Sequence, residues 1–159
     1  MNREKVIYDC NIHLQRLLNP DGPGGACIRL AMAGDVELVI SNYILDELRD
    51  LSTRPALRRA GISEQAVEGH ISELSRNCTL VTHVPLIFEH PIDRDDSHYV
   101  NLAIATEAKL IVSRDRHLLG LMDVTKPWSA DFRQRFAAIR ILTAEEFLRK
   151  IEQAGEPSV

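Results

Sequence analysis

The stretch from Lys5 to Asn11, which reads KVIYDCN, decides the fold that we expect for this chain. A short run of β-branched and aromatic residues ends on a carboxylate, and a helical segment follows, which is typical of a buried parallel strand. Such a strand delivers Asp9 to the carboxyl edge of an open α/β sheet, where these folds bind their ligands. If Asp9 belongs to a site, other strands should bring further carboxylates to the same edge.

Two such carboxylates follow other predicted strands. A strand at 37–40 leads into a helix that runs to about residue 52, and Glu47 lies at the margin of its apolar stripe. Because helical side chains lean toward the N-terminus, Glu47 can reach back toward the sheet edge. A strand at 109–112 is almost purely apolar, and Asp115 follows it as Asp9 follows the first strand.

A fourth carboxylate comes from the acidic run at 93–96, which precedes a predicted helix at 97–108. Asp96 shares one line of this helix with small and apolar residues, so it should face the body of the protein. Asp95 should point off to the side. The helical phase therefore favours Asp96 over Asp95 as a site residue.

Each of these acids also has an ordinary explanation as a helix cap, a turn former or a solvated side chain. Together, however, they would repel one another, since like charges about 4 Å apart cost on the order of several kcal/mol at an effective dielectric near 20. A bound divalent cation is the simplest compensation, and oxygen ligands favour Mg²⁺ or Mn²⁺ over zinc. His13, His98 and His117 each lie within a few residues of a candidate acid and could assist proton transfer or join the metal shell. They lack metal-binding spacing and are more often surface or loop residues, so we place no ligand on them.

The composition indicates one soluble domain. A length of 159 residues, with 45% hydrophobic and 26% charged residues, suits a single globular core. No apolar run approaches the roughly 20 residues of a membrane span, and the charged start is no signal peptide, so we expect a cytoplasmic protein. The cysteines Cys10, Cys27 and Cys78 form neither an even set nor a close pair, which predicts free thiols rather than disulfides or zinc ligands.

The formal net charge of −4 argues against strong non-specific binding of nucleic acids, because phosphate contacts need Lys and Arg. It does not exclude a nuclease, since an acidic pocket can lie beside a basic rim. Arg54, Arg58 and Arg59 form the densest run of positive charge. Such a run is most often a solvated helix face, but here it is also the best candidate for phosphate contact.

The rest of the chain continues the alternation of strand and helix. The turn-rich segment 19–25 predicts a flexible loop, and the segment 123–136 matches no element firmly. Further elements are predicted as helices at 11–18, 26–33, 63–76 and 116–122, strands at 78–82 and 139–142, and a final helix from a capping box at 143–146. This alternation predicts a three-layer α/β/α domain with a central parallel sheet.

Four segments give the sequence its resemblance to the PIN-domain family: VIYDCN at 6–11, ISNYILDEL at 40–48, DRDD at 93–96 before an alanine-rich helix, and LIVSRDRHLL at 110–119. The sequence resembles most closely the bacterial branch of toxins from toxin-antitoxin systems. The resemblance covers about residues 5–121, with a weaker match at 140–148. It implies a single PIN-like, Rossmann-like domain over 1–159, with a core at about 5–121 and a C-terminal strand and helix at about 139–154.

The resemblance also implies an activity, that of a Mg²⁺- or Mn²⁺-dependent endoribonuclease acting on single-stranded RNA. A toxin of this kind would have an antitoxin partner and would form a homodimer. The acids of the family map onto Asp9, Glu47, Asp96 and Asp115. Positions that support those acids by hydrogen bonding map onto Asn11, Ser41 and Ser113, and Asp95 could be the third ligand in place of Asp96.

The sequence departs from the family in three places. Cys10 stands where Thr is common, so a hydroxyl group near the site is missing. Arg114 stands where Gly is common, which places a cation next to Asp115 that can contact phosphate. The segment 123–138 is longer than usual in this branch.

Two other functions compete with the nuclease. A haloacid-dehalogenase-type phosphatase also begins with an Asp after its first strand and uses a late Asp pair, but Asn11 stands where it needs a second Asp. A PIN scaffold could also act only as a binding module. Retention of all four acids argues against that alternative.

Overall fold

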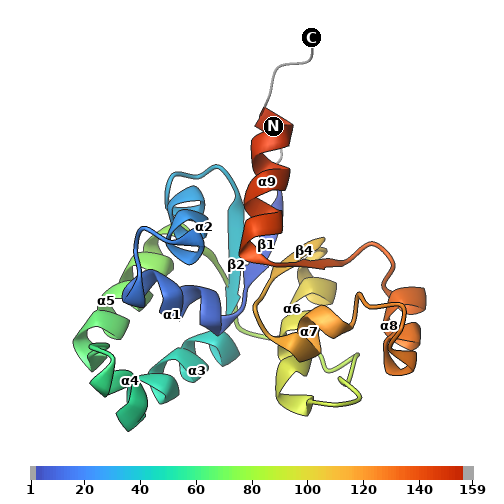
Figure 1. Cartoon of the computed structure of the whole chain (residues 1–159), viewed down its shortest axis with the longest axis horizontal. Coiled ribbons are helices and arrows are strands. Elements are labelled where there is room, and N and C mark those ends of the chain that lie inside the picture. Colours follow the sequence, from blue (N-terminus) through green and yellow to red (C-terminus); the bar gives the residue numbers. More distant parts are fainter. Residues whose placement is uncertain (1–2, 156–159) are drawn as a thin grey trace.

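A computed structural model describes residues 3–155 as an α/β structure around one parallel sheet (Figure 1). The strand order within this part of the chain is β3-β2-β1-β4-β5. The strands are β1 (Lys5–Tyr8), β2 (Glu37–Ser41), β3 (Thr79–Val81), β4 (Leu110–Val112) and β5 (Arg140–Leu142). The predicted parallel α/β fold is thus confirmed.

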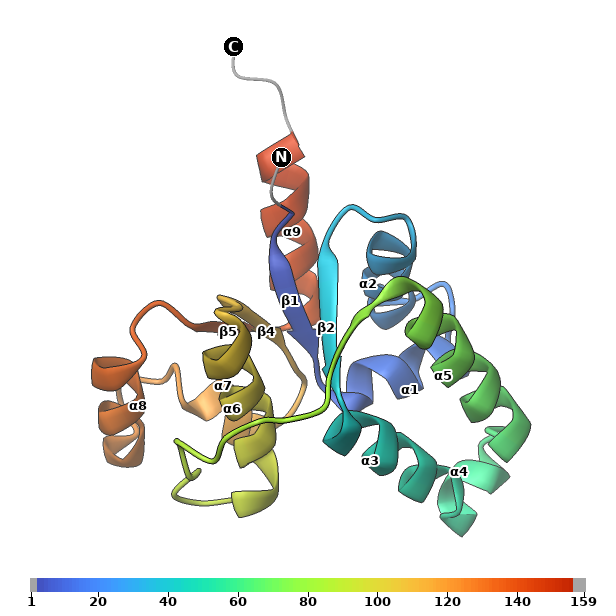
Figure 2. The same ribbon diagram turned by 180° about the vertical axis from the view of Figure 1, so that it is seen from behind.

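Helices flank this sheet on both faces. They are α1 (Cys10–Leu18), α2 (Pro23–Met32), α3 (Asn42–Ser52), α4 (Pro55–Arg59), α5 (Glu64–Asn77), α6 (Ser97–Thr106), α7 (Arg116–Gly120), α8 (Ala130–Arg135) and α9 (Ala144–Gly155). Two 3₁₀ turns, η1 (Arg94–Asp96) and η2 (Pro127–Ser129), precede α6 and α8. Seen from the two sides, α6 and α9 lie on opposite faces of the sheet (Figures 1 and 2). No helix within 3–155 is both long enough and apolar enough to span a membrane.

The central strand β1 lies between β2 and β4, and its residues Val6, Ile7 and Tyr8 have no exposed surface. From β1 the chain builds β2 and β3 on one side, then crosses back to build β4 and β5 on the other. The strand order therefore reverses between β1 and β4. The carboxyl ends of strands at such a switch point form the usual ligand crevice of α/β sheets.

The prediction of a flexible loop at 19–25 is wrong in part, because α2 begins at Pro23. Proline suits the first turn of a helix, where its missing N–H has no intrahelical partner. The glycines that follow serve close packing instead of chain flexibility. A Cβ atom on Gly25 would collide with the carbonyl oxygen of Pro20, and one on Gly24 would collide with Gln15 of α1.

The unassigned segment 123–136 forms η2 and α8 and packs against the long connection between β3 and η1. The ring of Phe132, which is fully buried, lies 5.5 Å from that of Phe88, centroid to centroid. Trp128 lies 5.4 Å from the buried ring of His90. These contacts connect the segment with the backbone that leads into the acidic run.

Candidate functional site

Asp9 lies at the carboxyl end of β1, where it is the N-cap of α1, and only 4% of its surface is exposed. Ser113 donates a hydrogen bond of 2.5 Å from its hydroxyl to Asp9 Oδ2, and the backbone N–H of Asn11 donates one of 3.3 Å to Oδ1. Burial raises the pKa of Asp9, and these hydrogen bonds offset only part of that rise. Asp9 is therefore both a helix cap and a buried acid.

Ser113 joins Asp9 to Asp115. Its hydroxyl oxygen accepts a hydrogen bond of 2.9 Å from the backbone N–H of Asp115. Asp115 in turn caps α7, accepting from the N–H groups of His117 at 2.7 Å and Leu118 at 3.3 Å. Because β1 and β4 pair in parallel, the two acids emerge side by side at the switch point.

Glu47 reaches this region from the second turn of α3. Its Oε1 accepts a hydrogen bond of 2.9 Å from the Tyr99 hydroxyl and lies 3.0 Å from His98 Nε2. The Tyr99 oxygen also accepts from the buried N–H of Cys10 at 3.1 Å. Burial by itself would raise the pKa of Glu47, but the bonds from His98 and Tyr99 outweigh it and hold that pKa below its usual value. Glu47 is thus a fixed, ionised carboxylate.

Asp96 differs from the other acids because it has a buried oxygen that accepts no hydrogen bond. This atom is Oδ2, and no donor group in the described residues forms a hydrogen bond to it. Burial raises the pKa of Asp96 to about 8, and the charges of Asp115, Asp93 and Asp9 add to this rise. Asp95, its neighbour in η1, is exposed. The structure thus turns Asp96, and not Asp95, toward the other acids.

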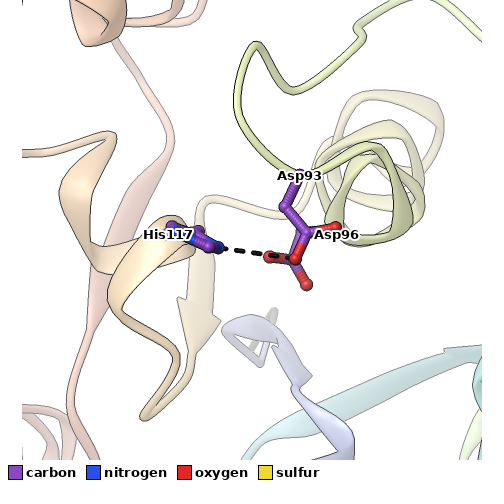
Figure 3. A group of neighbouring side chains, drawn as sticks. All are labelled: Asp93, Asp96 and His117. Atoms are coloured by element: carbon purple, nitrogen blue, oxygen red, sulfur yellow. Dashed lines mark hydrogen bonds and ion pairs between the residues drawn. The ribbon is translucent and has the colours of Figure 1, made fainter.

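Sequence patterns did not single out Asp93, and they placed no ligand on His117, yet these two residues adjoin Asp96 (Figure 3). His117 Nδ1 lies 3.4 Å from Asp93 Oδ2 and 4.0 Å from Asp115 Oδ1. One ligand atom from each of Asp93, Asp96 and His117 lies within 4.8 Å of the others. Two features of the sequence could have indicated these residues as ligands. Asp93 lies in the acidic run, and His117 lies two residues after Asp115.

The residues predicted to support the acids behave differently from one another. Ser113 contacts Asp9 directly, whereas the side chain of Asn11 is exposed and only its backbone N–H meets Asp9. The Ser41 hydroxyl accepts from the N–H of Ile44 at 3.2 Å. Within the described residues Ser41 therefore caps the helix that carries Glu47 and bonds to no acid directly.

The predicted phosphate-binding arginines are exposed. Arg54 lies 3.5 Å from Asp50, and Arg58 lies 2.7 Å from Glu64, so both take part in surface ion pairs. Such pairs are weak and screened by water, which leaves the guanidinium groups able to exchange partners. Arg59 is exposed on α4, and Arg114 is exposed next to Asp115.

Asp9, Glu47, Asp93, Asp96 and Asp115 together form what we call the acidic cluster. This cluster has the character of a cation site. Its unpartnered, buried oxygen on Asp96 and its raised carboxyl pKa values are unfavourable for the protein alone and would be relieved by a bound positive ion. The donor atoms are carboxylate oxygens with one imidazole nitrogen nearby. Divalent cations bind such groups.

A family model described as "PIN domain" matches residues 5–117, well over half of the 159 residues. This chain belongs to the PIN domain family. The match includes every residue of the acidic cluster and ends before η2 and α8. The match confirms the family predicted from the sequence, and it gives no support to the phosphatase alternative. PIN domains are generally nucleases and usually use divalent metals.

Two further proteins are similar to this PIN domain. It is 24% identical over 149 residues to the uncharacterized protein MJ1680 of Methanocaldococcus jannaschii, covering 94% of this chain and 92% of that protein. The crystal structure of VapBC2 from Rickettsia felis, bound to a DNA fragment from its promoter, matches with a TM-score of 0.52 at 14% identity. That match covers 87% of this chain and 98% of the other, and it supports the fold.

Proposed function

We propose that this PIN domain is a metal-dependent endoribonuclease that hydrolyses phosphodiester bonds of single-stranded RNA. The observation that carries the proposal is the buried, unpartnered oxygen of Asp96 amid the charges of Asp115, Asp93 and Asp9. Such an arrangement destabilises the folded protein. Destabilising arrangements of charge occur most often at functional sites. In this proposal the catalytic acids are Asp9, Glu47, Asp96 and Asp115.

The chemistry divides between the acids. A Mg²⁺ or Mn²⁺ ion held by Asp9, Asp96 and Asp115 would lower the pKa of a water molecule and stabilise negative charge in the transition state. Glu47 is ionised, and both of its hydrogen bonds fall on Oε1 in the described residues. Its Oε2 is therefore available to orient the attacking water and to accept its proton.

Ser113 and Tyr99 act through these acids. Ser113 sets the spacing of Asp9 and Asp115 because its hydroxyl contacts both, donating to one and accepting from the backbone of the other. Tyr99 holds Glu47 against the start of α1. Restraint of this kind keeps reacting groups in position and reduces the reorganisation that the reaction requires.

The substrate and the biological role extend the proposal. A flexible single strand can present its backbone to a recessed acidic site more easily than a stiff duplex can. Arg54, Arg58, Arg59 and Arg114 would contact phosphates. The resemblance to toxins and the fold likeness to VapBC2 support a single-domain cytoplasmic toxin that forms a homodimer and is inhibited by an antitoxin protein covering the acidic site.

The test is cleavage of single-stranded RNA by the purified protein with Mn²⁺ and, separately, with EDTA. Asp9→Asn and Asp115→Asn should each lower the rate by about 10²-fold or more, because each removes a charge from the reacting centre. Asp46→Asn is the matched control, since Asp46 is an exposed acid next to Glu47 on α3. Full activity in a folded Asp9→Asn or Asp115→Asn protein would refute the assignment. A folded wild-type protein without cleavage would favour the binding module.

A further inference from the structure

The cluster of Asp93, Asp96 and His117 differs from an all-oxygen site because an imidazole nitrogen faces the carboxylates (Figure 3). His117 Nδ1, the ring nitrogen nearer the backbone, is the atom that lies 3.4 Å from Asp93 Oδ2. Two ligands at roughly 2.1 Å from one ion can be at most roughly 4.2 Å apart. The observed separations, all within 4.8 Å, need only small side-chain rotations to meet that limit.

His90 ties together the two segments that carry Asp93 and His117. It is a buried residue, and its Nδ1 accepts hydrogen bonds from the backbone N–H groups of Ile92 at 3.1 Å and Asp93 at 3.0 Å. An Nδ1 that accepts leaves the ring proton on Nε2, which then donates to the backbone carbonyl of His117 at 2.9 Å. The neutral ring thus connects both backbones and sets the distance between them.

The surroundings hold His90 in this position. The Ser97 hydroxyl accepts from the N–H of His90 at 2.7 Å, and the Trp128 ring packs against its imidazole. Trp128 also lies directly against Gly120 of α7, where even a Cβ atom would not fit. Through Trp128, the segment 123–136 therefore packs against both the loop that carries Asp93 and the helix that carries His117. Metal ligands that are oriented by such buried contacts bind more tightly than free side chains do.

The chemistry of the donors distinguishes between metals. Mg²⁺ prefers oxygen ligands and water, whereas imidazole suits first-row transition metals. We infer that this site binds a first-row transition-metal ion in preference to Mg²⁺, with Asp93 and the Nδ1 atom of His117 as ligands beside Asp96. The inference rests on the proposed function, because it names the ion and two further ligands of the same site.

The alternative is an ion pair, in which a protonated His117 only neutralises Asp93. The separation of 3.4 Å is long for a charge-assisted hydrogen bond, which is usually about 2.7–2.9 Å, and both side chains are partly exposed. An ion pair would leave the buried oxygen of Asp96 without a partner. A shared cation accounts for both observations.

The test compares Mn²⁺ and Mg²⁺ binding to the full-length protein by titration calorimetry, together with pulsed electron paramagnetic resonance of the Mn²⁺ form. Wild-type protein should bind Mn²⁺ at least about tenfold more tightly than Mg²⁺ and should show coupling of Mn²⁺ to an imidazole nitrogen. His117→Ala should weaken Mn²⁺ binding by about 10- to 100-fold, change Mg²⁺ binding much less, and abolish the nitrogen coupling. Asp93→Asn should weaken binding of both ions.

Matched controls come from exposed residues of the same types. His83→Ala removes an exposed histidine and Asp95→Asn an exposed acid of the same run, and neither should change the binding of either ion. Thermal melting checks that each variant is folded. Unchanged Mn²⁺ affinity and nitrogen coupling in His117→Ala, or equal binding of both ions by the wild type, would overturn the inference.

RNA cleavage is measured in parallel so that the two proposals fail separately. Nitrogen coupling that depends on His117 in a protein without cleavage would refute the nuclease and leave the metal assignment intact. Cleavage that depends on Asp9, together with Mn²⁺ binding that does not change in His117→Ala, would refute the metal assignment and leave the nuclease proposal intact.

Discussion

Replacement of Asp96 by Asn should stabilise the metal-free protein while it abolishes cleavage. One oxygen of Asp96 is buried without a hydrogen-bond partner in the described residues, and the charges of Asp115 and Asp93 lie nearby. Burial and these charges together raise the pKa of Asp96 from 3.8 to about 8. Asn keeps the size of the side chain and removes the charge. The folded state should then lose an unfavourable interaction that the unfolded chain does not have.

The sign and size of this effect follow from the pKa. The unfolded chain releases the proton near pH 4, whereas the folded protein keeps it to about pH 8. The contribution of Asp96 to the free energy of unfolding therefore falls as pH rises from about 4 to about 8 and is lowest above that range. The full shift would correspond to about 5–6 kcal/mol, but solvent screens this partly exposed group, so we expect about 1–3 kcal/mol. For a chain of this length that is roughly 3–10 °C in Tm.

The assay is thermal melting in EDTA at pH 5 and at pH 8.5. The gain in Tm of Asp96→Asn over wild type should be larger at pH 8.5, where wild-type Asp96 is ionised. Asp95→Asn is the control, because it removes the neighbouring, exposed charge and should leave Tm unchanged. Mn²⁺ should raise the Tm of the wild type more than that of Asp96→Asn. A folded Asp96→Asn protein that melts at or below the wild-type temperature at pH 8.5 would refute the reasoning.

Three further perturbations test other parts of the structure. Tyr99→Phe removes the hydroxyl that holds Glu47 and leaves a buried backbone N–H unpaired. Thermal melting should show that the free energy of unfolding falls by about 1–3 kcal/mol, and RNA cleavage should slow. Unchanged stability and an unchanged rate would contradict this. Burial lowers the pKa of His70 to about 4, so its neutral form stabilises the fold fully above about pH 6.5 and less as pH falls toward 4. Urea unfolding between pH 7 and pH 4.5 should therefore depend less on pH in a folded His70→Gln variant, and an identical dependence would disprove the assignment. Gly25→Ala should lower the free energy of unfolding by about 1–3 kcal/mol, because the added methyl group overpacks α2 against Pro20. Gly69→Ala, which adds a methyl group in open space on α5, should be neutral or stabilising. Equal effects of the two variants in melting experiments would count against the described packing of α2.

Much of the architecture could be predicted because its signals are local. Strands buried on both faces read as continuous apolar runs, so β1, β2 and β4 were recognisable without tertiary information. The capping box at 143–146 also acts within one turn, and the bonds between Thr143 and Glu146 form as predicted. Asp9 and Asp115 directly follow paired strands, and for that reason their approach could be anticipated.

Other features could not be predicted because distant segments decide them. The glycines at 24–25 resemble a flexible turn until α1 and Pro20 are seen to lie against them. Asp93 and His117 are 24 residues apart in the chain, and His90 joins their backbones through hydrogen bonds that no local pattern indicates. The segment 123–136 has no strong periodicity of its own, and its aromatic side chains gain their place by packing against the connection between β3 and η1.

The sequence by itself determined the parallel α/β fold, the caps at the starts of α1 and α7, and the arrival of carboxylates at one sheet edge. Strand burial and helix capping act over a few residues, so they are written in short patterns. Only the tertiary structure decided that Asp96 keeps a buried oxygen without a partner in the described residues and that an imidazole faces the same acids. The physical reason is that desolvation and the geometry of ligand atoms depend on which remote segments pack together.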